Sequence, residues 1–195
     1  PWPGEMAVFR SPSTDGFELL TTFGSRARIG ALVSDFYPGP TSRFDHGNAL
    51  VVDLLTGTLE SVTDLTLLGG ANALAIESAP GTWEIVQAGA AELLAPGRYR
   101  LTRLLRGQRG TEGAMGNPAP AGALVVVLDA SLASLPIAEA DLGLPWNWRI
   151  GPASRPVSDE TYVAQSFTPA GVGLRPFSGA HVEQPWRRPR TPGDL

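Results

Sequence analysis

Few residues of this sequence have the spacing of a catalytic or metal-binding set. The two histidines, His46 and His181, lie far apart and the chain contains no cysteine, so a zinc site is not expected. We interpret both as structural residues, His46 in a surface turn. Carboxylate pairs such as Asp159 and Glu160 would support glycoside hydrolysis only across a cleft of defined width, and solvated turns explain them better. We therefore predict no catalytic residue, no metal ion and no cofactor, and we do not expect an enzyme.

Arg106 and Arg109 are the side chains most suited to bind an anion, because a guanidinium can form bidentate hydrogen bonds with a carboxylate or phosphate. They lie in a turn marked by Gly107 and Gly110, and glycine adopts positive φ angles without steric cost. Either the arginines clamp an anion, or they tie the turn to a carboxylate or to backbone carbonyls of the same chain. We favour the second interpretation.

Trp146 and Trp148 could contact either a sugar or another protein surface. Two residues apart on a strand, they would share one face. Exposed indoles would form a flat platform for a sugar ring, whereas buried ones would belong to the core or to a subunit contact. We favour core or subunit contact, and we expect Trp83 to lie in the core.

The stretch Arg98–Thr111 contains the strand that must position the arginine turn. Its apolar residues Tyr99, Leu101 and Leu105 are separated by arginines, which predicts a strand with one buried and one wet face. The turn then runs from Arg106 to Thr111.

Composition indicates a folded chain of many short strands. Of 195 residues, 43% are hydrophobic and 17% charged, and 23 glycines and 18 prolines favour turns over long helices. The net charge of −4 offers no basic surface, so nucleic-acid binding is not expected. No apolar run is long enough to predict a membrane span, and the first residues do not resemble a signal peptide.

Local patterns predict an all-β fold in which antiparallel sheets form a sandwich or barrel-like module over residues 1–182, with few or no long helices. Subdomains 1–68 and 69–182 are an alternative to one unit, and 183–195 reads as a linker to a following domain. Residues 56–72 are predicted as loop and weak strand, and the chain past Pro152 as irregular. The predicted strands are Glu5–Arg10, Phe17–Phe23, Arg28–Phe36, Ala49–Leu54, Asn72–Glu77, Thr82–Ala88, Gly97–Arg106, Ala123–Leu128, Leu132–Ile137 and Pro145–Ile150. The first two are predicted to form a hairpin across Asp15-Gly16, and the last two a hairpin around the turn Glu139–Gly143. The continuous apolar runs at Ala49–Leu54 and Ala123–Leu128 predict burial on both faces.

One motif and two further segments resemble a known family. The pattern Y-x-L-x-x-L-L-R-G-x-x-G-T is matched by Tyr99, Leu101, Leu104, Leu105, Arg106, Gly107, Gly110 and Thr111. It resembles the megatron-type baseplate protein of gene transfer agents and the tail-tip (host-specificity) proteins of long-tailed phages. Trp148–Asp159 and Gly173–Val182 fit the same family in the same order.

This resemblance implies a fragment of a structural virion protein at the tail tip or baseplate, which supports host attachment and DNA delivery. Its partners would be other tail proteins of the particle and two further copies of itself, in a homotrimer around the tail axis. The particle would assemble in the bacterial cytoplasm and act outside the cell after release. Candidate subunit contacts are Trp2, Trp146 and Trp186. The alternative is a carbohydrate-binding module that contacts glycans of the host envelope through the tryptophan pair and the long loop Tyr37–Asn48.

Overall fold

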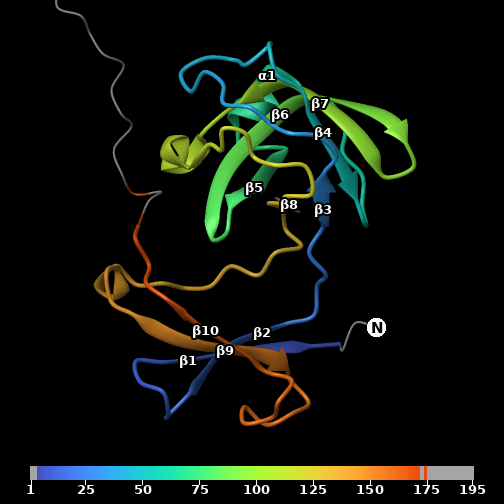
Figure 1. Ribbon diagram of the computed structural model, residues 1–195. Coiled ribbons are helices and arrows are strands. Elements are labelled where there is room, and N and C mark those ends of the chain that lie inside the picture. Colours follow the sequence, from blue (N-terminus) through green and yellow to red (C-terminus); the bar gives the residue numbers. More distant parts are fainter. Residues whose placement is uncertain (1–3, 172–173, 175–195) are drawn as a thin grey trace, which may run out of the picture.

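Two antiparallel sheets make up the part of the chain that the computed structural model describes, residues 4–171 and 174 (Figure 1). The helical elements are short: α1 (Asp64–Leu68) and the 3-10 turns η1 (Gln108–Gly110), η2 (Glu112–Ala114) and η3 (Glu139–Asp141). The strands are β1 (Met6–Ser11), β2 (Glu18–Phe23), β3 (Ile29–Leu32), β4 (Leu50–Leu54), β5 (Ala73–Ala79), β6 (Thr82–Ala95), β7 (Arg98–Leu105), β8 (Leu124–Val127), β9 (Trp146–Pro152) and β10 (Val163–Phe167). Over these described residues, the prediction of an all-β fold with antiparallel sheets and few or no long helices is confirmed.

The larger sheet is a closed barrel of six strands in the order β3-β4-β7-β6-β5-β8, in which β8 pairs back with β3. Its interior is filled by aliphatic side chains that alternate along each strand, as expected for a small barrel. Leu50 and Val52 on β4, Leu74 and Ile76 on β5, and Val86 on β6 are all fully buried. This packing supplies the hydrophobic core of the chain.

The expected burial of β4 and β8 on both faces is wrong. On β4, Leu50, Val52 and Leu54 point into the core, while Val51 and Asp53 between them are only half-buried. On β8, Leu124 is 38% exposed. A closed antiparallel barrel has one interior and no layer of helices outside it, so the second face of each strand is left at the surface.

The predicted alternation along β7 holds only for its first half. Tyr99 and Leu101 are buried as expected, but the next residue of the core is Leu104, and Leu105 is only half-buried. The change occurs at Arg103, whose φ of 55° interrupts the extended backbone. Opposite it lies Gly89, and a Cβ there would meet the Arg103 guanidinium. This break in the alternation turns the side chain of Arg106 towards the interior of the barrel.

The segment predicted as loop and weak strand contains the short helix α1. Thr63 caps it by accepting a hydrogen bond from the Thr66 N–H, and Leu67 is completely buried. The Arg103 guanidinium donates to the Val62 carbonyl and to the Asp64 carboxylate. Tertiary contacts thus outweigh the weak helix propensity of the sequence.

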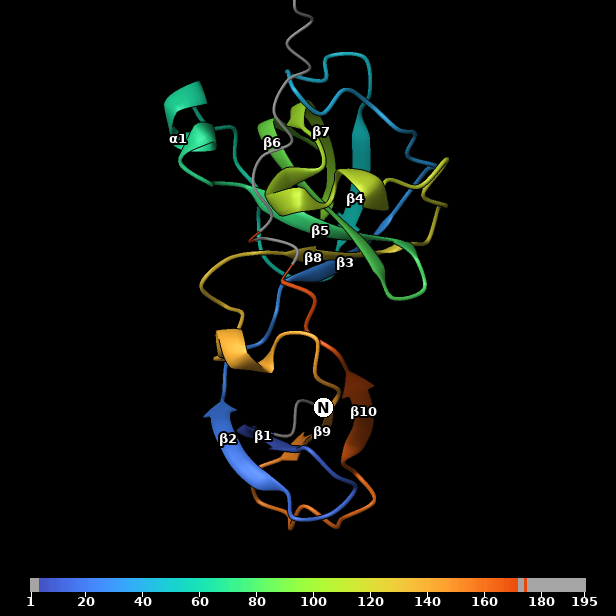
Figure 2. The same cartoon turned by 90° about the vertical axis from the view of Figure 1, so that its left-hand side faces the viewer.

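The smaller sheet joins the two ends of the described chain in the order β10-β9-β1-β2 (Figures 1 and 2). The predicted hairpin of β1 and β2 is confirmed. The second predicted hairpin is wrong, because residues 132–137 form no strand and β9 instead pairs with β1 and β10. The chain past Pro152 is not irregular throughout, since it forms β10.

The boundary proposed between residues 68 and 69 falls inside the barrel, whose strands come from both sides of it. The two sheets instead divide the chain: β3 to β8 form the barrel, and in the sequence they lie between the β1–β2 hairpin and the strands β9 and β10, which form the smaller sheet. Two chain segments, 24–28 and 128–145, connect the two sheets, and the Arg28–Asp129 ion pair joins these segments next to the barrel. The predicted linker 183–195 lies outside the described residues. Within the described part of the chain, no helix has the length and apolar character needed to span a membrane.

A Gly30→Ala substitution tests the closure of the barrel at β3. A Cβ at this position would overlap the backbone carbonyl of Asp53 on β4, which cannot move without breaking the β3–β4 pairing. We expect a loss of about 1–3 kcal/mol in the free energy of unfolding, measured by urea denaturation. Gly24→Ala is the control, because a Cβ there meets nothing within 4 Å. Equal stability of the two variants would contradict the described closure.

Candidate functional site

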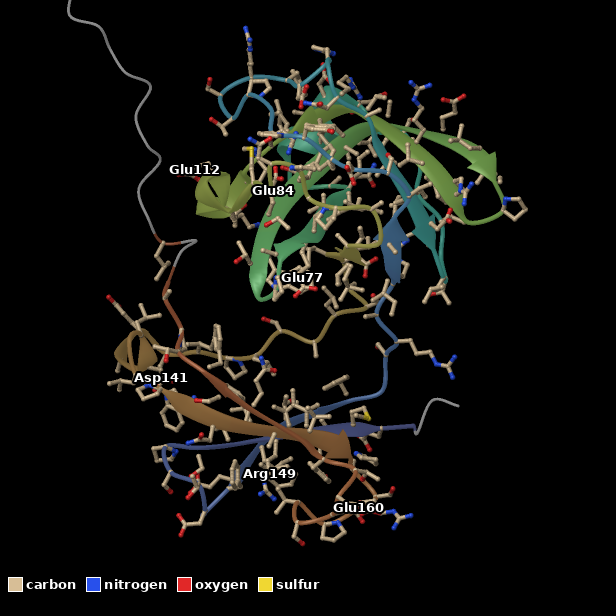
Figure 3. The ribbon with its side chains drawn as sticks, viewed as in Figure 1. Glu77, Glu84, Glu112, Asp141, Arg149 and Glu160 are labelled. Atoms are coloured by element: carbon tan, nitrogen blue, oxygen red, sulfur yellow. The ribbon has the colours of Figure 1, made fainter. Side chains whose placement is uncertain are left out.

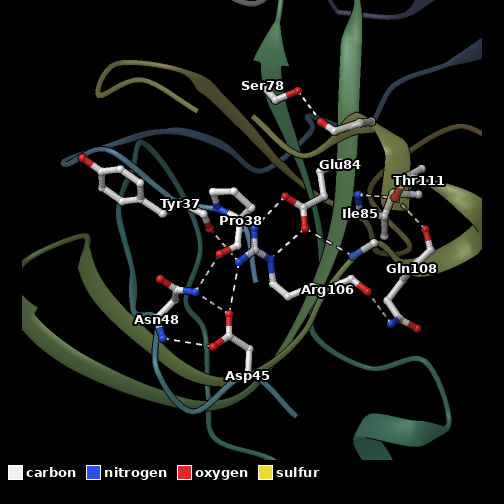
Figure 4. Close-up of polar contacts among 12 residues, drawn as sticks. Tyr37, Pro38, Asp45, Asn48, Ser78, Glu84, Ile85, Arg106, Gln108 and Thr111 are labelled. Atoms are coloured by element: carbon white, nitrogen blue, oxygen red, sulfur yellow. Dashed lines mark hydrogen bonds and ion pairs between the residues drawn. The ribbon is translucent and has the colours of Figure 1, made fainter. Parts of the chain in front are cut away.

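Arg106 is the centre of the most densely bonded polar cluster among the described residues, and its side chain is fully buried. Its Nε and Nη2 atoms donate to the two carboxylate oxygens of Glu84 at 2.7 and 3.0 Å, a bidentate pair (Figure 4). Its Nη1 donates to Asp45 Oδ2 at 3.1 Å and to the Tyr37 carbonyl at 2.9 Å. The guanidinium carbon also lies 3.9 Å from the centre of the Phe36 ring.

Glu84 lies opposite Arg106 because of the face that β6 turns inward. Glu84, Val86 and Ala88 point into the barrel, whereas Trp83 and Ile85 are only half-buried. The expectation that Trp83 lies in the core is therefore wrong. Figure 3 shows Glu84 within the barrel module. Its carboxylate also accepts a hydrogen bond from the Gly107 N–H at 3.2 Å.

Asp45 brings the long loop Tyr37–Asn48 to the same cluster. Its Oδ1 accepts the backbone N–H groups of Gly47 and Asn48, both at 3.0 Å, and its Oδ2 accepts the Asn48 side-chain amide at 2.7 Å. Its own backbone exchanges two hydrogen bonds with Leu104 on β7. The base of the loop is thus tied to the barrel by both backbone and side chain.

The protonation equilibrium of Asp45 reflects this environment. Burial raises the pKa of the carboxyl group, but hydrogen bonds from Asn48, Arg106 and Gly47 outweigh burial and hold the pKa below its ordinary value of 3.8. The folded-state pKa is therefore lower than the unfolded-state pKa. The ionised carboxylate stabilises the fold above the ordinary pKa, and this contribution is lost as the pH falls through the folded-state value.

The turn after Arg106 requires its glycines. Gly107 and Gly110 have φ angles of 57° and 78°, and Arg109 between them also has a positive φ of 56°. Thr111 closes the turn: its hydroxyl donates to the Gln108 carbonyl at 2.7 Å and accepts the Ile85 N–H of β6 at 2.9 Å. The turn is thereby held against the strand that contains Glu84.

The structure separates the two arginines of the motif. Arg106 makes the ties to a carboxylate and a backbone carbonyl that the sequence favoured. Arg109 is exposed, and its guanidinium forms no ion pair with the described residues. The sequence analysis did not identify Glu84 or Asp45 as partners of Arg106. The only local sign for Glu84 is that it alternates in step with Val86 and Ala88, whereas the large apolar residues Trp83 and Ile85 suggested that the other face of this strand is buried.

The cluster is built to hold the fold rather than to bind a diffusing ligand. Its guanidinium has no exposed surface, and four of its N–H bonds are directed at partners in the chain. A buried guanidinium is tolerated only when it is paired and hydrogen-bonded, and two carboxylates meet that requirement. In the described part of the chain, no group of three or more His, Cys, Asp and Glu residues is placed to hold a metal ion.

Trp146 and Trp148 lie on β9, as predicted, but they do not form an exposed platform. Trp148 is only 5% exposed, and Trp146 is half-buried beneath the Arg10 guanidinium, whose carbon lies 4.4 Å from the ring centre. Arg10 is held there by Asp141 at 2.9 Å. Trp2 and Trp186 lie outside the described residues.

Substitution of Arg106 by methionine tests the buried cluster. Removal of the cation leaves the carboxylates of Glu84 and Asp45 buried without their partner, so we expect a loss of about 3–5 kcal/mol in the free energy of unfolding. The control is Arg98→Met at the start of β7, whose pair with Asp53 is nearly half exposed to solvent and whose loss should therefore cost much less. Similar losses in the free energy of unfolding for both variants would show that the buried ion pairs stabilise the fold no more than the exposed pair does.

Substitution of Gly107 by alanine tests the turn. The residue would need a positive φ, and its Cβ would lie 2.6 Å from the Glu112 Cα, so we expect a loss of about 1–2 kcal/mol or more, measured by thermal unfolding. Gly110→Ala should also destabilise, through its φ of 78°. Gly113→Ala has open space around the new Cβ and serves as the control. The described turn is wrong if Gly107→Ala unfolds at the temperature of the control.

Comparison with known families matches residues 27–126 to the family described as "Rcc01698-like, C-terminal". The matched range covers just over half of the 195 residues and coincides with the barrel, from the residues before β3 to β8. It contains Arg106, Glu84 and Asp45. No curated protein matches the chain. On the strength of the family match, the chain belongs to the Rcc01698-like, C-terminal family.

Proposed function

We propose that the chain is a structural component of a phage-like tail tip or baseplate, in a gene transfer agent or a long-tailed phage, and supports host attachment and DNA delivery. The support is the resemblance of three segments to tail-tip proteins, together with membership of the family above. The segment Arg98–Thr111 forms β7 and its turn, and lies within the matched range.

One structural observation carries the proposal: residues of the tail-tip-like motif pack in the barrel core, hold its buried ion pairs and fasten the turn after β7. Tyr99 and Leu101 pack in the core, Arg106 holds the buried ion pairs, and Thr111 fastens the turn to β6. A motif made of such residues suits a rigid module that keeps its shape within a large particle. The proposal assigns this chain no catalytic role.

The partners in this proposal are other tail proteins and further copies of the chain. Closed cyclic symmetry is how identical subunits surround an axis, and the resemblance suggests three copies. Because Trp148 is buried within its own subunit, it is not a subunit contact here, whereas Trp146 is only half-buried. The tryptophan pair gives no support to the alternative sugar-binding function.

Immunogold electron microscopy of particles released by the source organism tests the proposal. Antibodies raised against the purified chain should label one end of the tail, and prior absorption with the same chain should remove the label. Deletion of residues 27–126 from the encoding gene should leave particles without a complete tip. Absence of the chain from purified particles, or label only on cell debris, would overturn the proposal.

A further inference from the structure

Strand β10 ends the smaller sheet and presents an open edge. Its only strand partner in the described part of the chain is β9, so the hydrogen-bonding groups of its outer edge have no strand beside them. All five of its residues are exposed, including Val163 at 66% and Phe167 at 49%. Such an edge is a template for another strand.

The two edges of this sheet differ in how they are protected. Edge strands usually discourage pairing through a charge, a proline or a bulge. Strand β2 begins with Glu18, and its register with β1 shifts between Thr21 and Leu19. Strand β10 reads VAQSF, contains no charge and no proline, and keeps an unbroken register with β9. Pairing is therefore favoured at β10 rather than at β2.

The sequence of β10 is complementary to itself in antiparallel orientation. If two copies pair about Gln165, Val163 lies opposite Phe167 of the partner subunit, and Ala164 lies opposite the partner's Ser166. On one face of the joined sheet, Val163 then meets the partner's Phe167 on either side of a central pair of Gln165 side chains. On the other face, the small residues Ala164 and Ser166 meet each other. No like charges are set opposite one another, because the strand has none.

We propose that β10 is a docking edge for β10 of a second copy, so that two four-stranded sheets join into one sheet of eight strands. This inference goes beyond the proposed function and does not depend on it. A two-fold contact uses the same surface on both copies, so it accounts for pairs of subunits. A three-fold arrangement would need a different surface.

Cysteine cross-linking tests the pairing directly, because the chain contains no cysteine of its own. In a Gln165→Cys variant, the paired Cα atoms would lie about 4.5–5.5 Å apart, within the range that a disulfide spans. Under mild oxidation we expect a covalent dimer on a non-reducing gel. Thr22→Cys, on the exposed part of edge β2, is the matched control and should remain a monomer.

The register provides a second check with its own control. Ser166→Cys alone would place the two thiols on a diagonal, with Cα atoms about 7–8 Å apart, and should cross-link poorly. A mixture of Ser166→Cys and Ala164→Cys chains should form mixed dimers, because these positions lie opposite each other. Cross-linking of Ser166→Cys alone as fast as Gln165→Cys would overturn the proposed register.

Sedimentation velocity over a range of concentrations supplies a readout without cysteine. Gln165→Lys sets two like charges opposite each other and should weaken the dimer several-fold, whereas Thr22→Lys should leave its affinity unchanged. Both positions are exposed, so both variants should fold, as circular dichroism can check. A dimer whose affinity is unchanged by Gln165→Lys, or weakened to the same extent by Thr22→Lys, would overturn the pairing through β10. A chain that stays monomeric in every variant and forms no Gln165→Cys cross-link would overturn it as well.

Discussion

A guanidinium with no exposed surface constrains the rest of the barrel. A cation removed from water is stable only beside compensating negative charge and with its donors occupied, so Arg106 dictates what must surround it. Glu84 on β6 and Asp45 in the long loop supply the charge, and the Tyr37 carbonyl accepts a further N–H. The cluster therefore fixes the positions of β6, the end of β7 with its turn, and the loop Tyr37–Asn48 relative to one another.

Smaller adjustments in the chain allow Arg106 to reach this position. A strand that alternated without interruption from Tyr99 would keep odd-numbered residues inside and place Arg106 at the surface. The positive φ of Arg103 breaks that alternation, and Gly89 on β6 leaves room for its guanidinium. The side chain of Arg103 then donates to the Val62 carbonyl before α1 and to the Gly89 carbonyl on β6, so that the irregular residue also ties this segment to β6.

The sequence was sufficient for the fold class and for most strands, because alternation and glycine–proline turns are local signals. It was insufficient where distant segments decide the outcome. The pairing of β1 with β9 joins residues more than 130 positions apart, and no local pattern distinguishes it from a hairpin within 132–150. The arginine turn was located correctly, but its carboxylate partners were not, since Glu84 and Asp45 become neighbours of Arg106 only when the barrel closes.

Native-state hydrogen exchange of the Asp45 and Leu104 amides tests the central claim most directly, because each N–H donates to the other residue's carbonyl beside the Arg106 cluster. If the buried ion pairs hold the loop to the barrel, these two amides should exchange only through global unfolding, with the same opening free energy as amides of the barrel core such as that of Val86. Exchange of both amides through a local opening of much lower free energy, while Val86 stays protected, would contradict the account.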